Sequence, residues 1–286
     1  MSFRTYREVT GVDRSRLGQQ VGAQRARVAA RLRDVRATVA IMSGKGGVGK
    51  SFVTAALAFG AARRLAGGVG VLDADLKSPT VARLLGAKGA VRVSEAGVHP
   101  RETVDGIRVM STSFLLEDGS PLTWREHPGE RFVWRGVLEA GAVREFLSDV
   151  VWGSLDLLLV DLPPGADKLS DLAELVPTLA GAIAVTIPSD ESHASVQRAM
   201  HAARDAHVRL LGVVENMSGY SCDGCATTRP LFSGDAGAAL ANEFGVPLLA
   251  RIPFHATATA VHAPMVGDAL IDRVIATLVS TEHSIA

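Results

Sequence analysis

One segment of eight residues constrains the fold of this chain more than any other part of it. The segment fits the pattern G-x-x-x-x-G-K-S/T and comprises Gly44, Lys45, Gly46, Gly47, Val48, Gly49, Lys50 and Ser51. An apolar run at 37–43 precedes it, and a helical pattern begins near its end. Glycines let successive backbone N–H groups surround an anion, and the N-terminus of the following helix adds partial positive charge at the same place. A strand, a phosphate-binding loop and a helix in this order predict a nucleotide-binding α/β domain.

The rest of the chain alternates short apolar runs with helical patterns. Further runs rich in Val, Ile, Leu and Ala lie at 69–75, 155–161, 181–187, 208–214 and 248–253. Such runs are typical of strands that are buried on both faces. Amphipathic segments lie between them, as at 193–204, where Val196, Ala199, Met200 and Ala203 share one face. The alternation predicts a P-loop NTPase fold: a doubly wound, mostly parallel sheet with helices on both faces.

We expect an arm followed by one large domain. Residues 1–36 form the predicted arm, an arginine-rich helix, and residues 37–286 form a single P-loop ATPase domain. Within that domain we expect an inserted region with a small hairpin at about 87–127 and a cysteine-bearing loop at 217–232.

The arm concentrates positive charge in a chain whose formal net charge is zero. Residues 1–40 carry nine arginines and three acidic residues, a balance of +6. Apolar residues recur along it at helical intervals: Leu17, Val21, Val28, Leu32 and Val35. Two interpretations stay open: a solvated helix with a thin apolar stripe, and a docking arm for an acidic partner.

Composition narrows the setting in which the protein works. No stretch approaches the roughly 18–20 uninterrupted apolar residues of a transmembrane helix, and the first ten residues are polar, unlike a secretory signal. Two cysteines in 286 residues fit a reducing compartment. The zero net charge argues against a global attraction to nucleic acid or to anionic membranes. We therefore expect a cytoplasmic protein that binds neither membrane nor nucleic acid.

Three carboxylates are predicted to gather near the phosphate loop. Asp161 ends one apolar strand, and Asp73 and Asp75 end another. An isolated aspartate after a strand is often a cap or turn residue, but ligands of such sheets collect at the carboxyl ends of the strands. We expect Lys50 to reach the β- and γ-phosphates of ATP, and we expect Ser51, Asp73 and Asp161 to hold Mg²⁺.

Lys45 is a second lysine in the loop that the general pattern does not require. It is either a solvated lysine or a cation that reaches a nucleotide held by a facing subunit, where it would stabilise the charge of the transition state.

Both cysteines of the chain lie in one C-x-x-C motif, Cys222 and Cys225. An iron–sulfur cluster or a zinc ribbon normally takes four thiolates, and none of the eight histidines lies near the motif. Two copies of the chain would supply four thiolates on the axis of a symmetric dimer. A dimer-bridging metal centre, a redox dithiol and incidental thiols all remain open at this point.

Several motifs together resemble those of the Mrp family of ATPases. They are GKGGVGKS (44–51), DADLKSPT (73–80), WRG (134–136), DLPPG (161–165), GVVENMS (212–218) and the C-x-x-C pair (222–225). This family comprises iron–sulfur cluster carriers of the deviant Walker A class, which also includes MinD, ParA and the nitrogenase iron protein. The similarity extends over roughly residues 37–275.

The resemblance implies a function and a set of site residues. It implies an ATP-hydrolysing homodimer that holds a [4Fe–4S] cluster between its subunits through Cys222 and Cys225 and transfers it to apo iron–sulfur client proteins. Lys45 would act across the interface and Asp75 would orient the attacking water. The implied nucleotide contacts run along the loop to Phe52 and include Asn216 at the adenine and, in a loop near the base, Asp190. Because Ala166, Asp167 and Lys168 stand where the family has Thr-Gly-Asp, we expect slow hydrolysis.

Three other ATPase functions compete with this interpretation. A MinD/ParA-like switch would need a basic face or a basic tail helix, but the tail 266–286 contains one strong cation, Arg273. A reductase like the nitrogenase iron protein has its cluster cysteines far apart in sequence. A nickel or other metal-insertion ATPase shares the C-x-x-C motif but not the GVVENMS segment.

Overall fold

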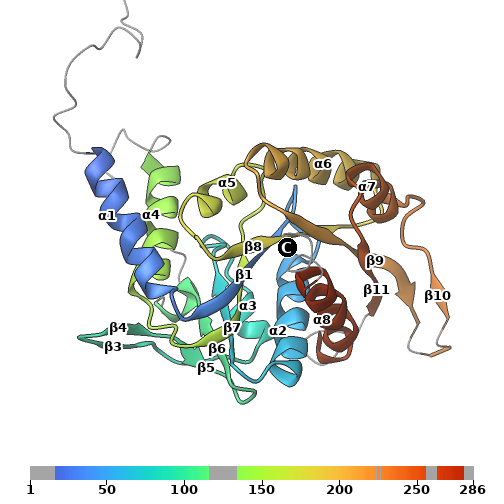
Figure 1. The fold of residues 1–286 in the computed structure, drawn as a ribbon. Helices are drawn as coiled ribbons and strands as arrows, with labels where there is room; N and C mark the ends of the chain where they lie inside the picture. Colours follow the sequence, from blue (N-terminus) through green and yellow to red (C-terminus); the bar gives the residue numbers. More distant parts are fainter. Residues whose placement is uncertain (1–16, 116–133, 223, 226, 256–262, 280–286) are drawn as a thin grey trace, which may run out of the picture.

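The computed structural model describes residues 17–115, 134–222, 224–225, 227–255 and 263–279. Within them a twisted sheet is covered by helices on both faces (Figure 1). Its strands are β1 (Val35–Met42), β2 (Val69–Asp73), β5 (Arg101–Glu102), β6 (Ile107–Met110), β7 (Leu155–Asp161), β8 (Leu179–Thr186), β9 (Leu210–Ser221), β10 (Thr228–Arg229) and β11 (Leu248–His255). A separate hairpin pairs β3 (Arg92–Ser94) with β4 (Gly97–His99).

The helices alternate with these strands along the chain. They are α1 (Leu17–Arg31), α2 (Lys50–Arg64), α3 (Val81–Leu84), α4 (Trp134–Asp149), α5 (Lys168–Ala173), α6 (Asp190–Asp205), α7 (Ala236–Phe244) and α8 (Ala263–Val279). No described helix has both the length and the apolarity needed to cross a membrane.

The strand order places β1 at the centre of the sheet. The order is β10-β9-β8-β1-β7-β2-β6-β5, and β11 pairs with β9 on its other edge. All described pairings in this sheet are parallel except β5 with β6 and β9 with β10. Because the chain goes from β1 to β2 on one side, whereas the later strands β8 and β9 lie on the other side of β1, ligands are expected at the carboxyl end of β1.

Two apolar layers hold the sheet between the helices. Val39 and Ile41 of β1 face a layer formed with α2, α3 and α8, whereas Ala40 and Met42 face a layer formed with α1, α4, α5, α6 and α7. Successive side chains of a strand point to opposite faces, so strands that are apolar throughout are buried on both sides. The predicted doubly wound α/β fold is confirmed.

The structure also revises details of that prediction. The expected strand at 208–214 is β9, which continues to Ser221, so the cysteine motif follows a long strand directly. The predicted insertion at 87–127 contains the expected hairpin, β3–β4, but β6 joins the main sheet as a parallel neighbour of β2. Residues 116–133 of that range lie outside the described residues. The expected strand 69–75 ends at Asp73, so Asp75 lies in the following turn.

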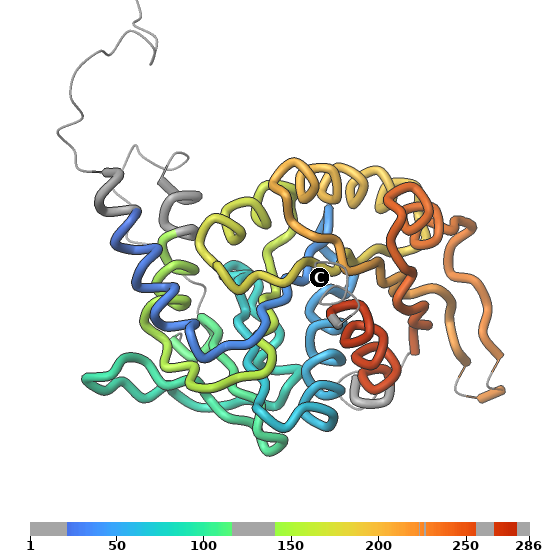
Figure 2. Tube along the Cα trace, viewed as in Figure 1, coloured from blue at the N-terminus to red at the C-terminus, as the bar shows by residue number. Residues whose placement is uncertain are grey.

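Helix α1 packs on the domain and does not project from it. It lies beside α4 (Figure 2), and its Val28 is fully buried in the apolar layer together with Leu32, which follows the helix. Its arginines bond to the domain: Arg25 to Glu174, Arg27 to Asp149, and Arg31 to the carbonyls of Ser148 and Ala96. The predicted boundary at residue 36 falls inside β1. These contacts give the arginines of α1 a structural role, and residues 1–16 of the predicted arm lie outside the described residues.

Helices α2 and α8 approach so closely that only glycine fits between them. A methyl group at Gly60 would overlap the carbonyl oxygen of Gly267, and one at Gly267 would overlap the carbonyl oxygen of Ala56. Because backbone cannot yield as a side-chain end can, we expect Gly60→Ala to lower the free energy of unfolding by about 1–3 kcal/mol. Urea denaturation measures this.

Gly22→Ala is the matched control, because Gly22 is an exposed residue of α1 with open space around its Cα. Alanine there gains helix propensity, up to about 1 kcal/mol. Equal stability of Gly60→Ala and the wild type would contradict the close packing of α2 and α8.

Candidate functional site

The phosphate loop connects β1 to α2 at the carboxyl edge of the sheet. Gly47 and Gly49 have φ angles of 81° and 80°, in the left-handed region that glycine adopts without strain. A Cβ on Gly44 would overlap the backbone of Ser195 in α6, and a Cβ on Gly49 would overlap the side-chain amide of Asn216. The shape of the loop therefore depends on its glycines, as the motif predicts.

Asp161 is the centre of a buried hydrogen-bond cluster beside this loop. Its carboxylate is fully buried at the end of β7 and accepts from Lys50 Nζ at 2.8 Å, from Ser51 Oγ at 2.7 Å and from Thr54 Oγ1 at 2.9 Å. All three donors come from the start of α2. Charge-assisted hydrogen bonds of this kind offset the cost of burying a carboxylate.

Asp73 lies next to Asp161 but is poorly compensated. The two residues are Cα partners in the pairing of β2 with β7. Asp73 Oδ2 accepts from the Val81 N–H at 3.3 Å and from Ser111 Oγ at 3.2 Å, whereas its buried Oδ1 has no hydrogen-bond partner among the described residues. Burial raises the pKa of Asp73 to about 8, and the charge of Asp161 adds to the rise.

The oxygen atoms gathered here suit a hard cation. Mg²⁺ takes oxygen ligands, and Ser51, Asp161 and Asp73 present a hydroxyl and two carboxylates within one cluster. The unpartnered Oδ1 of Asp73 is a buried acceptor that a cation would satisfy. The residues present therefore fit the metal that the sequence predicts.

Asn216 contacts the other side of the phosphate loop. It lies in β9, is buried, and donates from Nδ2 to the carbonyl of Val48 at 2.9 Å. Phe52, in the first turn of α2, packs against the apolar layer. A hydrogen bond with its own backbone, the Ser189 hydroxyl and the charge of Lys45 all lower the pKa of Glu191, in the first turn of α6. Lys45 therefore lies near the start of α6. Asp190 is exposed as the first residue of α6.

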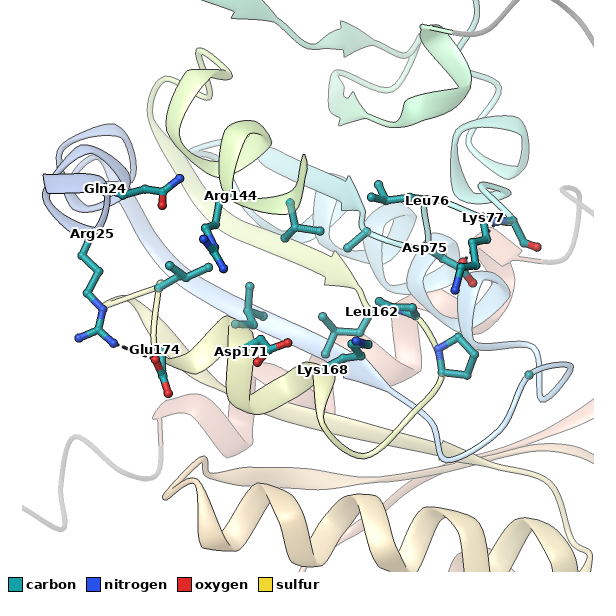
Figure 3. Close-up of a pocket in the computed structure, with 18 of the residues that line it drawn as sticks. Gln24, Arg25, Asp75, Leu76, Lys77, Arg144, Leu162, Lys168, Asp171 and Glu174 are labelled. Carbon is teal, nitrogen blue, oxygen red and sulfur yellow. Dashed lines mark hydrogen bonds and ion pairs between the residues drawn. The ribbon is translucent and has the colours of Figure 1, made fainter. Parts of the chain in front are cut away.

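A cavity of about 530 Å³ opens from the tip of the phosphate loop toward α1, α4 and α5. Figure 3 shows Asp75 and Lys77 at one end and the ion pair between Arg25 and Glu174 at the other. Gly46 and Gly47 border the same cavity, so Asp75 lies in the space next to the phosphate-binding backbone. Its carboxylate accepts from the Ser78 N–H at 3.3 Å and is partly exposed.

The two cysteines lie on a hairpin at the far end of β9. The Cys222 N–H donates to the carbonyl of Thr227 at 3.1 Å, which closes the turn between β9 and β10. Cys222 is half-buried, Cys225 is exposed, and neither forms a disulfide. Hydrogen bonds from the Thr227 side chain, the Thr227 backbone and Cys222 lower the pKa of the Cys225 thiol. Lowering the pKa favours the thiolate, which is the metal-binding form.

The structure thus forms two separate groups from the predicted residues. Lys50, Ser51, Asp73 and Asp161 meet at one edge with the loop and Asn216, whereas Cys222 and Cys225 lie on the β9–β10 hairpin (Figure 1). Among the described residues, no hydrogen bond or ion pair joins the Asp190 side chain to the loop. Within the described part of the chain, no three His, Cys, Asp or Glu side chains are placed to share a metal ion.

Sequence reasoning missed three residues that shape these groups: Thr54, Ser111 and Glu215. Thr54 and Ser111 donate to the two carboxylates. Buried Glu215 precedes Asn216 and accepts from the Gly237 N–H at 2.7 Å. Thr54 lies one helical turn after Lys50, a spacing that could have indicated it. Ser111 follows β6, which the prediction had left out of the main sheet.

The fold and the phosphate loop define a P-loop nucleotide-binding protein. A family model described as NUBPL iron-transfer P-loop NTPase, within the ParA group, matches residues 34–269. The chain belongs to this family, in agreement with the resemblance found in its motifs.

Two relatives of this chain are named for a role with iron–sulfur clusters. The iron-sulfur cluster carrier protein of Saccharolobus solfataricus is 38% identical over 246 residues, which span 84% of this chain and 79% of that protein. The human cytosolic Fe-S cluster assembly factor NUBP2 is 40% identical over 228 residues, 78% of this chain and 80% of its own length.

Solved structures agree on the fold. A nucleotide-binding protein from Archaeoglobus fulgidus in complex with ADP has a TM-score of 0.67 and 34% identity, over 87% of this chain and 92% of that one. The septum site-determining protein MinD of Pyrococcus horikoshii, complexed with Mg-ADP, has a TM-score of 0.52 and 20% identity, over 83% and 94% of the two chains. The second likeness concerns the fold alone.

The raised pKa of Asp73 predicts a pH-dependent stability. Between about pH 4 and 8 the folded protein keeps a proton on Asp73 that the unfolded chain releases, so the free energy of unfolding should fall as the pH rises through this window. In EDTA at pH 8, Asp73→Asn should therefore be more stable than the wild type, on the order of a few kcal/mol. Thermal unfolding at several pH values measures the difference.

Asp105→Asn serves as the control, since Asp105 is exposed in a turn. A wild-type protein whose stability relative to Asp73→Asn does not change between pH 5 and pH 8 would contradict the raised pKa.

Proposed function

We propose that this protein is an ATP-dependent carrier that binds a [4Fe–4S] cluster as its cargo and delivers it to apo iron–sulfur proteins. The observation that carries the proposal is the cysteine hairpin: both cysteines of the chain, free and accessible, lie together on a P-loop NTPase of the iron-transfer family. Two relatives are named as an iron-sulfur cluster carrier protein and as an Fe-S cluster assembly factor, and these names support the same cargo. The human relative is named as cytosolic, and we place the work of this chain in the cytosol.

The phosphate loop is the proposed site of ATP. Lys50 would exchange its contact with Asp161 for the β- and γ-phosphates, and the loop N–H groups from Gly44 to Ser51 would surround them. Asn216 would lie at the adenine, with Asp190, the first residue of α6, near the base. Ser51, Asp73 and Asp161 would hold Mg²⁺, which supplies positive charge that neutralises the phosphates.

Hydrolysis is the proposed means of switching between two states of the protein. Asp75 would orient a water for attack on the γ-phosphorus, with cleavage of the bond to the β-phosphate oxygen to yield ADP and inorganic phosphate. Asp75 borders the same cavity as Gly46 and Gly47, which supports this position. We expect slow turnover, because Ala166 and Asp167 stand where the family motif has a threonine hydroxyl and a glycine.

A homodimer is the proposed holder of the cluster. One chain offers two thiolates, and two hairpins related by a two-fold axis offer the four that a [4Fe–4S] cluster requires. The lowered thiol pKa of Cys225 favours the thiolate, which is the form that binds iron.

Removing either thiol should remove the cargo and leave the fold intact. After anaerobic reconstitution, we expect about four irons and four sulfides per wild-type dimer, and at least a tenfold loss in Cys222→Ser and in Cys225→Ser. Iron and sulfide analysis, with absorption near 400 nm, measures this. Ser221→Ala is the control, because Ser221 lies beside Cys222 and carries no thiol. Full iron content in the cysteine variants would refute the carrier proposal.

The proposed action of Lys45 across the dimer can be tested by mixing variants. Lys45→Ala and Asp75→Asn should each be nearly inactive in ATP hydrolysis as pure dimers. In a mixed dimer one nucleotide site combines an intact Asp75 with Lys45 of the other subunit. An equal mixture should therefore regain about a quarter of the wild-type rate.

The rate of phosphate release, measured after subunit exchange, gives the result. A mixture that stays as inactive as the pure variants would show that Lys45 serves its own subunit.

A further inference from the structure

Glu215 is a buried carboxylate for which the proposed chemistry has no use. It lies in β9 with its side chain 4% exposed, directly before Asn216. Its Oε2 accepts from the Gly237 N–H in the first turn of α7 at 2.7 Å, and its Oε1 lies 3.2 Å from Nε of Arg251 in β11. Arg251 also bonds to Asp235, the residue that precedes α7. One side chain therefore ties β9 to both elements packed on its outer side.

The approach of α7 to β9 is built around this carboxylate. A Cβ at Gly237 would lie 2.6 Å from Cβ of Glu215 and 2.8 Å from its Oε2. A Cβ carbon does not approach another nonbonded heavy atom within 3 Å, so the helix needs glycine at this position to reach the carboxylate. Glutamate at 215 and glycine at 237 thus act as a pair.

The neighbouring residue on β9 contacts the nucleotide loop. Successive side chains of a strand point to opposite faces, so Glu215 faces α7 whereas Asn216 faces the phosphate loop and donates to the carbonyl of Val48. A displacement of the loop that pulls on Asn216 is opposed one residue away by the ties of Glu215.

The same strand continues to the cysteines. Met217 has a φ angle of 54°, unusual for a residue other than glycine, and the pairing of β9 with β11 shifts register between Ile252 and Phe254. Beyond this irregularity Tyr220 and Ser221 pair with both β10 and β11, and Cys222 follows. Asn216 and Cys222 are six residues apart, about 20 Å of extended chain. In Figure 1, β9 runs without interruption from the sheet to the hairpin with β10.

We propose that Glu215 is a positioning residue that makes the cysteine hairpin respond to nucleotide. By anchoring β9 to α7 and β11, it holds Asn216 against the phosphate loop, so that ordering of the loop by ATP is passed along β9 to Cys222 and Cys225. Without the contacts of Glu215, β9 bends locally at Met217, and ordering of the loop no longer changes the cysteine hairpin. The inference rests on the proposed ATP site but requires no bound cluster.

The test compares thiol reactivity with and without nucleotide in cluster-free, reduced protein. The rate of modification by 5,5′-dithiobis(2-nitrobenzoate) is measured without nucleotide and with saturating Mg-ATP, whose affinity is determined for each variant. We expect ATP to slow the wild-type reaction at least about threefold, because the ordered loop restrains the hairpin. In Glu215→Ala the ratio of the two rates should fall to one.

Two further variants distinguish the effect of side-chain length from the effect of charge at position 215. Glu215→Gln keeps an acceptor at the distance of the Gly237 N–H and should retain most of the ATP effect. Glu215→Asp keeps the charge but is one methylene too short, and it should lose the effect as alanine does. Since Glu215→Asp alters the buried site least in composition, it preserves the test if Glu215→Ala does not fold, as judged by circular dichroism.

Glu243→Gln is the matched control, because Glu243 is a carboxylate of α7 that bonds to Gln197 of α6 and not to β9. It should keep the full ATP effect. A wild-type rate that ATP does not change would overturn the inference, and so would an undiminished effect in folded Glu215→Asp. Because the assay uses no iron, either result leaves the cluster-carrier proposal to be decided by the iron content of the cysteine variants.

Discussion

The buried carboxylate of Asp161 organises the nucleotide end of this molecule. It carries charge into the interior at the end of β7, and Lys50, Ser51 and Thr54 of α2 compensate it there. An ionised carboxylate in such a place costs several kcal/mol unless it is paired, so β7 and the start of α2 must remain in contact. The phosphate loop lies between these two elements, and its glycines allow it to close over the short distance that the contact leaves. The geometry of the loop therefore depends on the compensated carboxylate of Asp161 as well as on the loop's own residues.

Asp73 is a second buried carboxyl group, but its hydrogen bonds compensate it poorly. It lies beside Asp161 on the neighbouring strand, yet it has two long hydrogen bonds and one oxygen that finds no partner in the described part of the chain. A buried oxygen without a partner lowers the stability of the folded protein, and a cation bound there would offset that loss. Two adjacent aspartates, one compensated by the protein and one with an unpartnered oxygen, fit the proposed magnesium site.

The cysteine pair lies far from the Asp161 cluster. Among the described elements, β9 is the one that reaches both sites. Its Asn216 contacts the phosphate loop, and Cys222 follows its last residue. A strand with neighbours on both edges is a stiff element, and the irregularity at Met217 is the place where it can bend. The elements that border this region, α7 and β11, meet β9 at Glu215. A carrier that alternates between holding and releasing cargo needs a connection of this kind, because nucleotide can change the affinity for cargo only through a differential interaction.

The sequence by itself determined the elements whose causes are local. The glycine-rich loop, the apolar strands buried on both faces, the amphipathic helix α6 and the C-x-x-C pair all depend on residue type and spacing, and the structure contains each of them. Only the tertiary structure decided which elements became neighbours. It placed β6 in the main sheet, which brought Ser111 to Asp73; it packed Val28 of α1 and the following Leu32 into the core; and it extended β9 from the phosphate loop to the cysteines. Hydrophobic periodicity reports whether a segment is buried but not what covers it, because burial is non-directional, whereas a buried charge such as Glu215 is stable only where specific partners from distant segments meet it.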